Sequence, residues 1–168
     1  PWTWAKKNGR EVSVEALFRE IQKSKQENDI EGVTFLGGEP FDQAEPLGKL
    51  ALLVKDSGLT VMTFSGYLYE DLKERAEAQD LLSATDLLID GPFMKDKLDL
   101  SRPWAGSSNQ RYHFLTPFYQ HLENKLITID NKLEIRIGED GSVSVNGMAT
   151  QRTLNELFDR KAFRKIKK

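Results

Sequence analysis

The 168-residue sequence contains no cysteine. That absence excludes disulfides, thiolate nucleophiles and any cluster or zinc site built on cysteine within this chain. No apolar run approaches the ~18 residues of a membrane span, and no segment resembles a signal peptide, so we expect a cytoplasmic protein. The net charge is only −2, which gives no drive toward nucleic acid or membrane surfaces, and we expect neither as a partner.

Nucleotide-binding glycine patterns are also missing. No predicted strand is followed by GxGxxG or a P-loop, which disfavours an ordinary dinucleotide or nucleoside triphosphate site. What remains is the composition of one soluble globular core, with 39% hydrophobic and 30% charged residues. A chain of 168 residues is too short for two comfortable domains.

The most informative stretch covers residues 33–42, VTFLGGEPFD. A β-prone run leads into Gly37 and Gly38, which let the backbone approach a ligand, and Asp42 is placed to cap the following helix. Glu39 is then held at the carboxyl end of a strand, where α/β folds bind ligands. Glycine N–H groups and a carboxylate suit a ligand with both a carboxylate and an ammonium, such as an amino acid. A plain tight turn explains the same residues equally well.

Hydrophobic periodicity predicts alternating helices and strands. Helices are predicted over 12–27, 42–57 and 69–78, and strands over 32–36, 59–64 and 87–90, with Ser13 as an N-cap and Gly58 as a helix stop. Right-handed crossovers place such strands side by side in a parallel sheet. The turns at 37–39, 65–67 and 90–92 should therefore open at one edge, which is the expected ligand site.

The sequence changes character after residue 92. Residues 93–111 predict a long polar loop whose Arg102, Asn109 and Arg111 offer donors to a carboxylate or phosphate, although solvated loop polarity is an equal alternative. A short helix is expected from residue 116, a β-hairpin over 133–145 and a helix over 150–158. The basic tail at 160–168 is either a solvated surface or a partner-binding segment.

Four segments follow one another along the chain: 36–40 (LGGEP), 63–67 (TFSGY), 86–93 (DLLIDGPF) and 106–111 (GSSNQR). Together they resemble radical S-adenosylmethionine enzymes, and within them the small activating enzymes of anaerobic ribonucleotide reductase and, more distantly, of pyruvate formate-lyase. Pro1 and Trp4 resemble the stretch that follows the CxxxCxxC cluster loop of those enzymes. The resemblance therefore places the three cluster cysteines upstream of Pro1.

The resemblance implies an α/β fold, a partial TIM-type barrel of βα units with a small C-terminal β-hairpin and helix. Residues 1–112 would form the barrel core, and residues 113–168 an extension of the same domain. The implied reaction is reductive cleavage of S-adenosylmethionine at a [4Fe–4S] cluster. The resulting radical abstracts hydrogen from a glycine of a partner such as anaerobic ribonucleotide reductase, with flavodoxin or ferredoxin as electron donor.

The resemblance also implies which residues lie along S-adenosylmethionine, and it assigns no acid, base or nucleophile. The methionyl end falls to Gly37, Gly38, Glu39 and Pro40, the neighbouring strand ends to Thr63, Ser65 and Asp90, and further contacts to Asn109 and Arg111. Without cysteines this chain alone is expected to be inactive. Two alternatives stay open: a radical enzyme acting on a small molecule, and a cluster-less module for S-adenosylmethionine binding or protein interaction.

Overall fold

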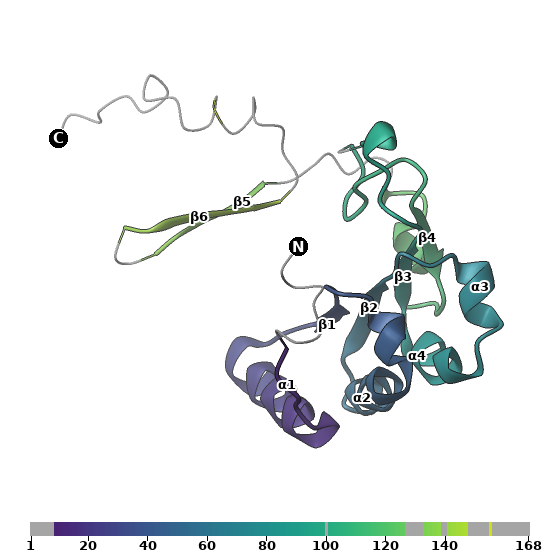
Figure 1. Cartoon of the computed structure of the whole chain (residues 1–168). Helices are drawn as coiled ribbons and strands as arrows, with labels where there is room; N and C mark the ends of the chain where they lie inside the picture. The colour runs from purple at the N-terminus through teal and green to yellow at the C-terminus, as the bar shows by residue number, and fades with distance from the viewer. Residues whose placement is uncertain (1–8, 100, 127–132, 139–140, 148–154, 156–168) are drawn as a thin grey trace.

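The computed structural model describes residues 9–99, 101–126, 133–138, 141–147 and 155 (Figure 1). Its helices are α1 (Val14–Asn28), α2 (Ala44–Asp56), α3 (Tyr69–Lys73) and α4 (Gln79–Ala84), with short 3-10 turns at Pro40–Gln43, Ala76–Ala78, Lys95–Lys97 and Gln120–Leu122. Its strands are β1 (Gly32–Phe35), β2 (Thr60–Phe64), β3 (Leu87–Asp90), β4 (Arg111–Phe114), β5 (Leu133–Ile137) and β6 (Val143–Gly147). The fold is mixed α/β, as predicted.

The described strands form one four-stranded sheet and one hairpin. In the sheet β1, β2 and β3 are parallel neighbours, which confirms the predicted βαβ units. The sequence did not predict β4, which pairs antiparallel with β3 and places Arg111 opposite Asp90. The open sheet does not confirm a partial barrel, so the barrel remains a prediction.

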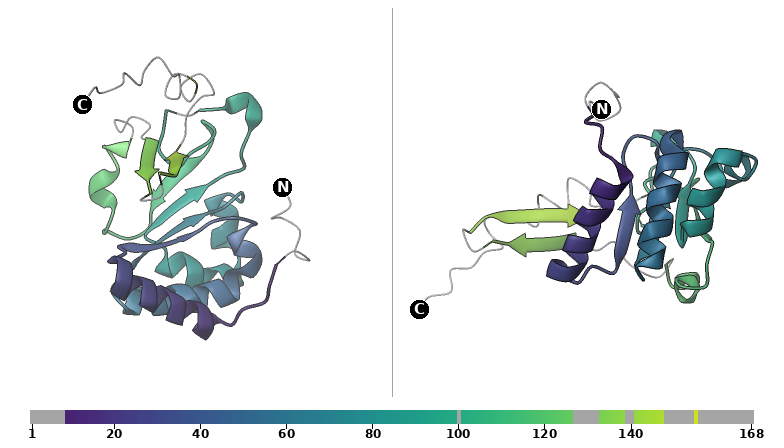
Figure 2. Two further views of the ribbon diagram at one scale, coloured as in Figure 1. Left: turned by 90° about the vertical axis from the view of Figure 1, so that its left-hand side faces the viewer. Right: turned by 90° about the horizontal axis from the view of Figure 1, so that it is seen from below.

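Helices α1, α2 and α4 cover one face of the four-stranded sheet (Figure 1; Figure 2). Side chains alternate between the two faces of a strand, and Val61 and Leu88 are fully buried beneath Ala51 and Val54 of α2. Leu81 of α4 completes this core. The predicted periodicity of the first two helices therefore reflects their packing onto the sheet.

The helix boundaries confirm two predicted signals and correct two others. Ser13 caps α1 by accepting a hydrogen bond from the Ala16 amide at 3.2 Å, and Gly58 follows α2 with φ +80°. The prediction that Asp42 caps the second helix was wrong, because Asp42 lies within a 3-10 turn that precedes α2. Glu39 caps this turn. The predicted helix over 69–78 is interrupted, since Arg75 is extended and separates α3 from the next turn.

The region after β3 is more ordered than the sequence predicted. Within the polar loop, Leu98 forms a β-bridge with Ser107 before the chain enters β4. The helix expected from residue 116 is only the turn Gln120–Leu122, whereas the predicted hairpin is present as β5 and β6. The predicted helix at 150–158, the basic tail, Pro1 and Trp4 lie outside the described residues, apart from residue 155.

Two fully buried aspartates lie at the ends of β3. At its amino end, the Asp86 carboxylate accepts hydrogen bonds from Lys55 Nζ at 2.6 and 2.7 Å, from the Val61 amide at 2.9 Å and from the Thr116 hydroxyl at 2.5 Å. At its carboxyl end lies Asp90. Buried carboxylates require such partners, so these bonds fix β3 against β2 and α2.

No helix in the described parts of the chain is long and apolar enough to cross a membrane.

The contact between α2 and α4 depends on Gly48. A Cβ added there would lie 2.8 Å from the Cβ of Asp80 and 3.0 Å from the Leu81 amide nitrogen. Alanine normally favours a helix interior by about 1 kcal/mol over glycine, but here the clash should dominate. We expect Gly48→Ala to lower the free energy of unfolding by roughly 1–2 kcal/mol in urea denaturation. The neighbouring control Lys49→Ala should change it by less than about 0.5 kcal/mol; an equal loss in both variants would contradict the close-packing argument.

Candidate functional site

Glu39 joins the turns that follow β1 and β2. Its Oε1 accepts hydrogen bonds from the Phe41 amide at 3.0 Å and the Ser65 hydroxyl at 2.9 Å, and its Oε2 accepts one from the Gly66 amide at 2.8 Å. The Ser65 hydroxyl in turn accepts from the Tyr67 amide at 3.0 Å. The predicted residues Glu39 and Ser65 therefore come together, and we call this set of bonds the Glu39 clamp.

The clamp holds the glycine pair at the carboxyl edge of the sheet. Gly37 and Gly38 have φ values of +85° and +58°, in the left-handed region that glycine adopts without steric cost. A Cβ at either position would meet no atom within 4 Å, so conformation rather than crowding favours glycine here. Both residues are exposed, and neither forms a hydrogen bond to another backbone group of the described residues. Their peptide groups are accessible to a ligand.

Asp90 links β3, β4 and the start of α3. It accepts hydrogen bonds from the Tyr69 amide at 2.7 Å, from Arg111 Nε at 3.0 Å and from a second Arg111 nitrogen. Arg111 also donates to both carboxylate oxygens of Glu70, at 3.1 and 2.7 Å. The guanidinium that the sequence offered to a ligand is thus paired with two carboxylates within the protein.

The electrostatics of this group follow from its contacts. Burial alone would raise the pKa of Asp90, but the Arg111 side chain, the Tyr69 amide and the nearby His113 together hold that pKa below its ordinary value. Hydrogen bonding to Arg111 lowers the pKa of Glu70 to about 2. His113 Nε2 lies 3.1 Å from Asp90 Oδ1, although its approach falls outside hydrogen-bond geometry. Both carboxylates are ionised at neutral pH.

Thr63 lies apart from the exposed turns. Its side chain is fully buried, and its hydroxyl is 2.9 Å from that of Thr85. Because side chains alternate along β2, Thr63 shares the helix-covered face with Val61. Pro40 is buried at the start of the 3-10 turn that the clamp holds.

Asn109 and Gln110 brace the turn that follows β3. Asn109 donates to the Pro92 carbonyl at 2.7 Å, and its Oδ1 has no hydrogen-bond partner among the described residues. Gln110 Oε1 accepts from the amides of Gly106 and Ser107, and its Nε2 donates to the Gly91 carbonyl at 3.2 Å. Sequence reasoning named neither Gln110 nor Glu70 as a site residue. Their signals were the position of Gln110 inside the GSSNQR segment and that of Glu70 shortly after the TFSGY segment.

Known proteins resemble the chain over most of these residues. The family model for the 4Fe-4S single cluster domain matches residues 1–113. An anaerobic ribonucleoside-triphosphate reductase-activating protein of Pasteurella multocida is 36% identical over 95 residues, which are 52% of this chain and 58% of that protein. Proteins of the same name from Haemophilus influenzae and Vibrio cholerae are 32% and 29% identical, covering 60% and 68% of this chain and 71% and 76% of their own lengths. The chain thus spans little more than half of the Pasteurella protein.

Arg111 is the residue whose loss should most affect this group. In Arg111→Gln the buried Asp90 loses its charged partner, and we expect the free energy of unfolding to fall by about 2–3 kcal/mol at pH 7. This loss is smaller than for a fully buried ion pair, because the Arg111 side chain is 42% exposed. The two lowered pKa values mean that the stabilisation is complete above the ordinary carboxylate pKa and is lost as pH falls through the lowered values. Urea denaturation at several pH values should therefore show the difference from wild type shrinking below about pH 4. The exposed control Lys23→Gln should show no such convergence; a pH-independent difference for Arg111→Gln would contradict the assignment.

Proposed function

The chain belongs to the 4Fe-4S single cluster domain family, within the activating-enzyme group of radical S-adenosylmethionine proteins. From this premise we propose that it forms the S-adenosylmethionine-binding core of an enzyme that activates an anaerobic ribonucleotide reductase. Three relatives carry the name of activating proteins for such a reductase. The observation that best supports the proposal is the Glu39 clamp, which holds two exposed glycines in a left-handed turn at the carboxyl edge of the sheet.

The glycine turn fits the amino-acid end of S-adenosylmethionine. Exposed peptide groups at Gly37 and Gly38 can donate to a carboxylate and accept from an ammonium with no Cβ in the way. The Glu39 carboxylate already accepts three hydrogen bonds, so its proposed role is to position the turn, together with Ser65, rather than to bind the ammonium itself. Of the remaining candidates, Pro40, Asp90, Asn109 and Arg111 would shape the surrounding turns, and Thr63 would support β2 from its helix-covered face.

The residues present do not fit a [4Fe–4S] cluster. The chain has no cysteine, and the part that the structure describes contains no group of three or more His, Cys, Asp or Glu side chains placed to hold a metal. No step through a cluster therefore follows from these residues. Reductive cleavage of S-adenosylmethionine, and formation of a glycyl radical on the reductase with flavodoxin or ferredoxin as electron donor, are proposed for the whole protein.

The proposed fold of the whole protein is a partial TIM-type barrel to which β1, β2 and β3 contribute successive βα units. The support is their parallel order and the helices on one face. In such a barrel the carboxyl ends of the strands carry the active site, which agrees with the position of the Glu39 clamp.

The reaction can be tested on the protein as encoded in full, reconstituted anaerobically with iron and sulfide and then reduced. We expect it to bind S-adenosylmethionine, to release methionine and 5′-deoxyadenosine, and to produce a glycyl radical signal in electron paramagnetic resonance on the anaerobic reductase. If the protein neither binds nor cleaves S-adenosylmethionine, the proposal is overturned. Cleavage without a radical on the reductase would favour a small-molecule substrate, and binding without cleavage would favour a cluster-less module.

The glycine turn can be tested with a matched pair of variants. Gly38→Ala places a Cβ in open space but in a left-handed conformation, which costs alanine about 1–2 kcal/mol. If bound S-adenosylmethionine requires this conformation, the dissociation constant of S-adenosylmethionine measured by calorimetry should rise by roughly 5- to 30-fold. Gly141→Ala has a similar φ of +80° and no neighbour within 4 Å, yet it lies in the hairpin turn. It should leave binding unchanged; equal effects in the two variants would argue against a binding role for the turn.

A further inference from the structure

Trp104 has a backbone conformation that a bulky residue rarely adopts. Its φ is +63°, and the only other non-glycine residue with positive φ in the described part of the chain is Asp29, which ends α1. The flanking residues hold the loop in place. Arg102 donates hydrogen bonds to Asp99 and to the carbonyls of Ser107 and Gln110, and Ala105 is fully buried. The loop therefore maintains the strained conformation, and such strain is found most often where a side chain serves a function.

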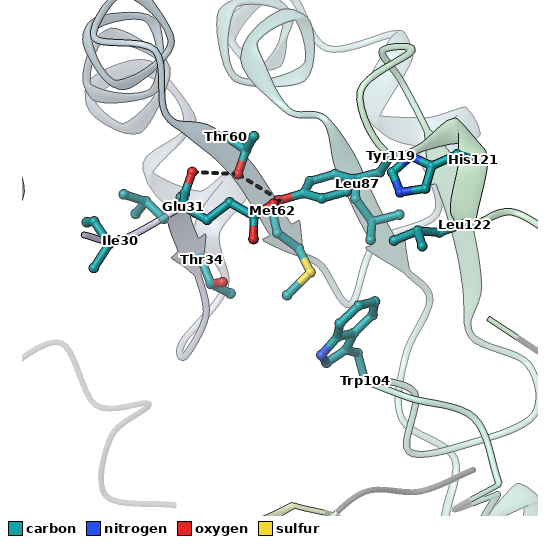
Figure 3. A pocket seen from close by; sticks show the side chains of 12 residues that line it. Ile30, Glu31, Thr34, Thr60, Met62, Leu87, Trp104, Tyr119, His121 and Leu122 are labelled. Atoms are coloured by element: carbon teal, nitrogen blue, oxygen red, sulfur yellow. Dashed lines mark hydrogen bonds between the residues drawn. The ribbon is translucent and has the colours of Figure 1, made fainter. Parts of the chain in front are cut away.

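The strained conformation presents the Trp104 indole to a pocket rather than to the core. Its side chain is 42% exposed, and it lines a cavity of about 550 Å³ on the sheet face opposite the helices (Figure 3). Met62, Leu87 and Leu122 supply further apolar lining, and Tyr119 supplies a second aromatic ring. A cavity of this size is in the range of specific binding sites.

The other side of the pocket is polar and carries a carboxylate. The Tyr119 hydroxyl lies 2.8 Å from that of Thr60 and 3.5 Å from Glu31 Oε1, so it connects the aromatic and acidic sides (Figure 3). Glu31 is exposed, and none of the described lysines or arginines forms an ion pair with it. The described lining contains no lysine or arginine, and its one histidine is His121. Among the described residues, the pocket thus combines the rings of Trp104, Tyr119 and His121 with the Glu31 carboxylate, which has no ion-pair partner there.

We propose that this pocket receives a guanidinium group, the side chain of an arginine in a polypeptide segment of the partner. The inference rests on the proposed function, which supplies a protein partner. Charge complementarity favours a cation, because no described lysine or arginine forms an ion pair with Glu31. The Trp104 ring favours a planar cation that can stack on it. A guanidinium can stack and pair with a carboxylate at once, which a lysine ammonium does less well.

Two features favour a polypeptide over a free small cation. Phe118 is 51% exposed and packs edge-on against the lining residue Tyr119, with ring centroids 4.8 Å apart. An exposed apolar side chain next to a lining residue offers a contact to residues that flank the arginine. Thr34 lines the pocket on β1, three residues before Gly37. At ~3.3 Å per extended residue the pocket and the glycine turn lie about 10 Å apart, within reach of one short segment.

The assignment can be tested with the intact chain and two short peptides. The probes are acetyl-Gly-Arg-Gly-amide and the same peptide with citrulline, which has the same shape without the charge. The indole N–H signal of Trp104 in nitrogen-15 NMR, identified by its loss in Trp104→Gly, reports binding. We expect the arginine peptide to shift this signal with a dissociation constant in the millimolar range and the citrulline peptide to bind roughly tenfold more weakly.

Variants separate recognition from structure. Glu31→Gln should remove the preference for arginine, whereas Glu20→Gln, an exposed glutamate on α1, should preserve it. Trp104→Gly relieves the left-handed conformation, so its melting temperature should stay within ~5 °C of wild type or rise, while peptide shifts at neighbouring pocket amides disappear. A larger fall in melting temperature with those amide shifts retained would assign Trp104 a structural role.

The proposal is overturned if the arginine peptide causes no shift at about 20 mM, well above the expected dissociation constant, or if both peptides bind equally. Displacement of the peptide by free guanidinium alone at equal concentration would assign the site to a small cation instead of a polypeptide. None of these measurements involves S-adenosylmethionine or iron. Their failure would therefore leave the proposed function standing, whereas failure of that function would appear as absent S-adenosylmethionine binding and cleavage.

Discussion

The structure depends on the two buried carboxylates at the ends of β3. Asp86 ties the amino end of this strand to Lys55 and the β2 backbone, and Asp90 ties the carboxyl end to Arg111 and the start of α3. A buried carboxylate is tolerated only with such partners, so each one specifies the position of several elements at once. Because β3 is the internal strand between β2 and β4, fixing its two ends also fixes the turns at the carboxyl edge.

At that edge, the side chains hold the turns in place, whereas the backbone offers the accessible polar groups. The most conspicuous carboxylate of the sequence, Glu39, is occupied by donors from two turns, and the accessible polar groups are instead those of the glycine backbone. Such an arrangement suits a cofactor that carries its own reactivity, because the protein then has only to bind and orient it.

The opposite face of the sheet has a different character. Helices bury one face, whereas the other holds a pocket with aromatic, apolar and acidic lining beside a strained tryptophan. Strain that the loop must compensate is hard to explain by packing alone, since the indole remains 42% exposed. Backbone binding of a cofactor at the edge and side-chain recognition on the face would keep the two tasks on separate residues of one short sheet.

Local sequence determined the parallel βα units, the Ser13 cap, the helix stop at Gly58 and the convergence of three turns, because periodicity, capping and glycine conformation are properties of neighbouring residues. It indicated Glu39, Ser65, Asp90 and Arg111 as a group of interest, but only tertiary structure decided their partners. Arg111 meets Glu70 across 41 positions and Trp104 meets Glu31 in one pocket across 73, because β4 folds back antiparallel onto β3. Contacts between residues so distant along the chain leave no periodic signal in the sequence. The sequence therefore indicated candidate side chains, whereas the fold alone determined which of them pair with each other and which remain accessible to a ligand.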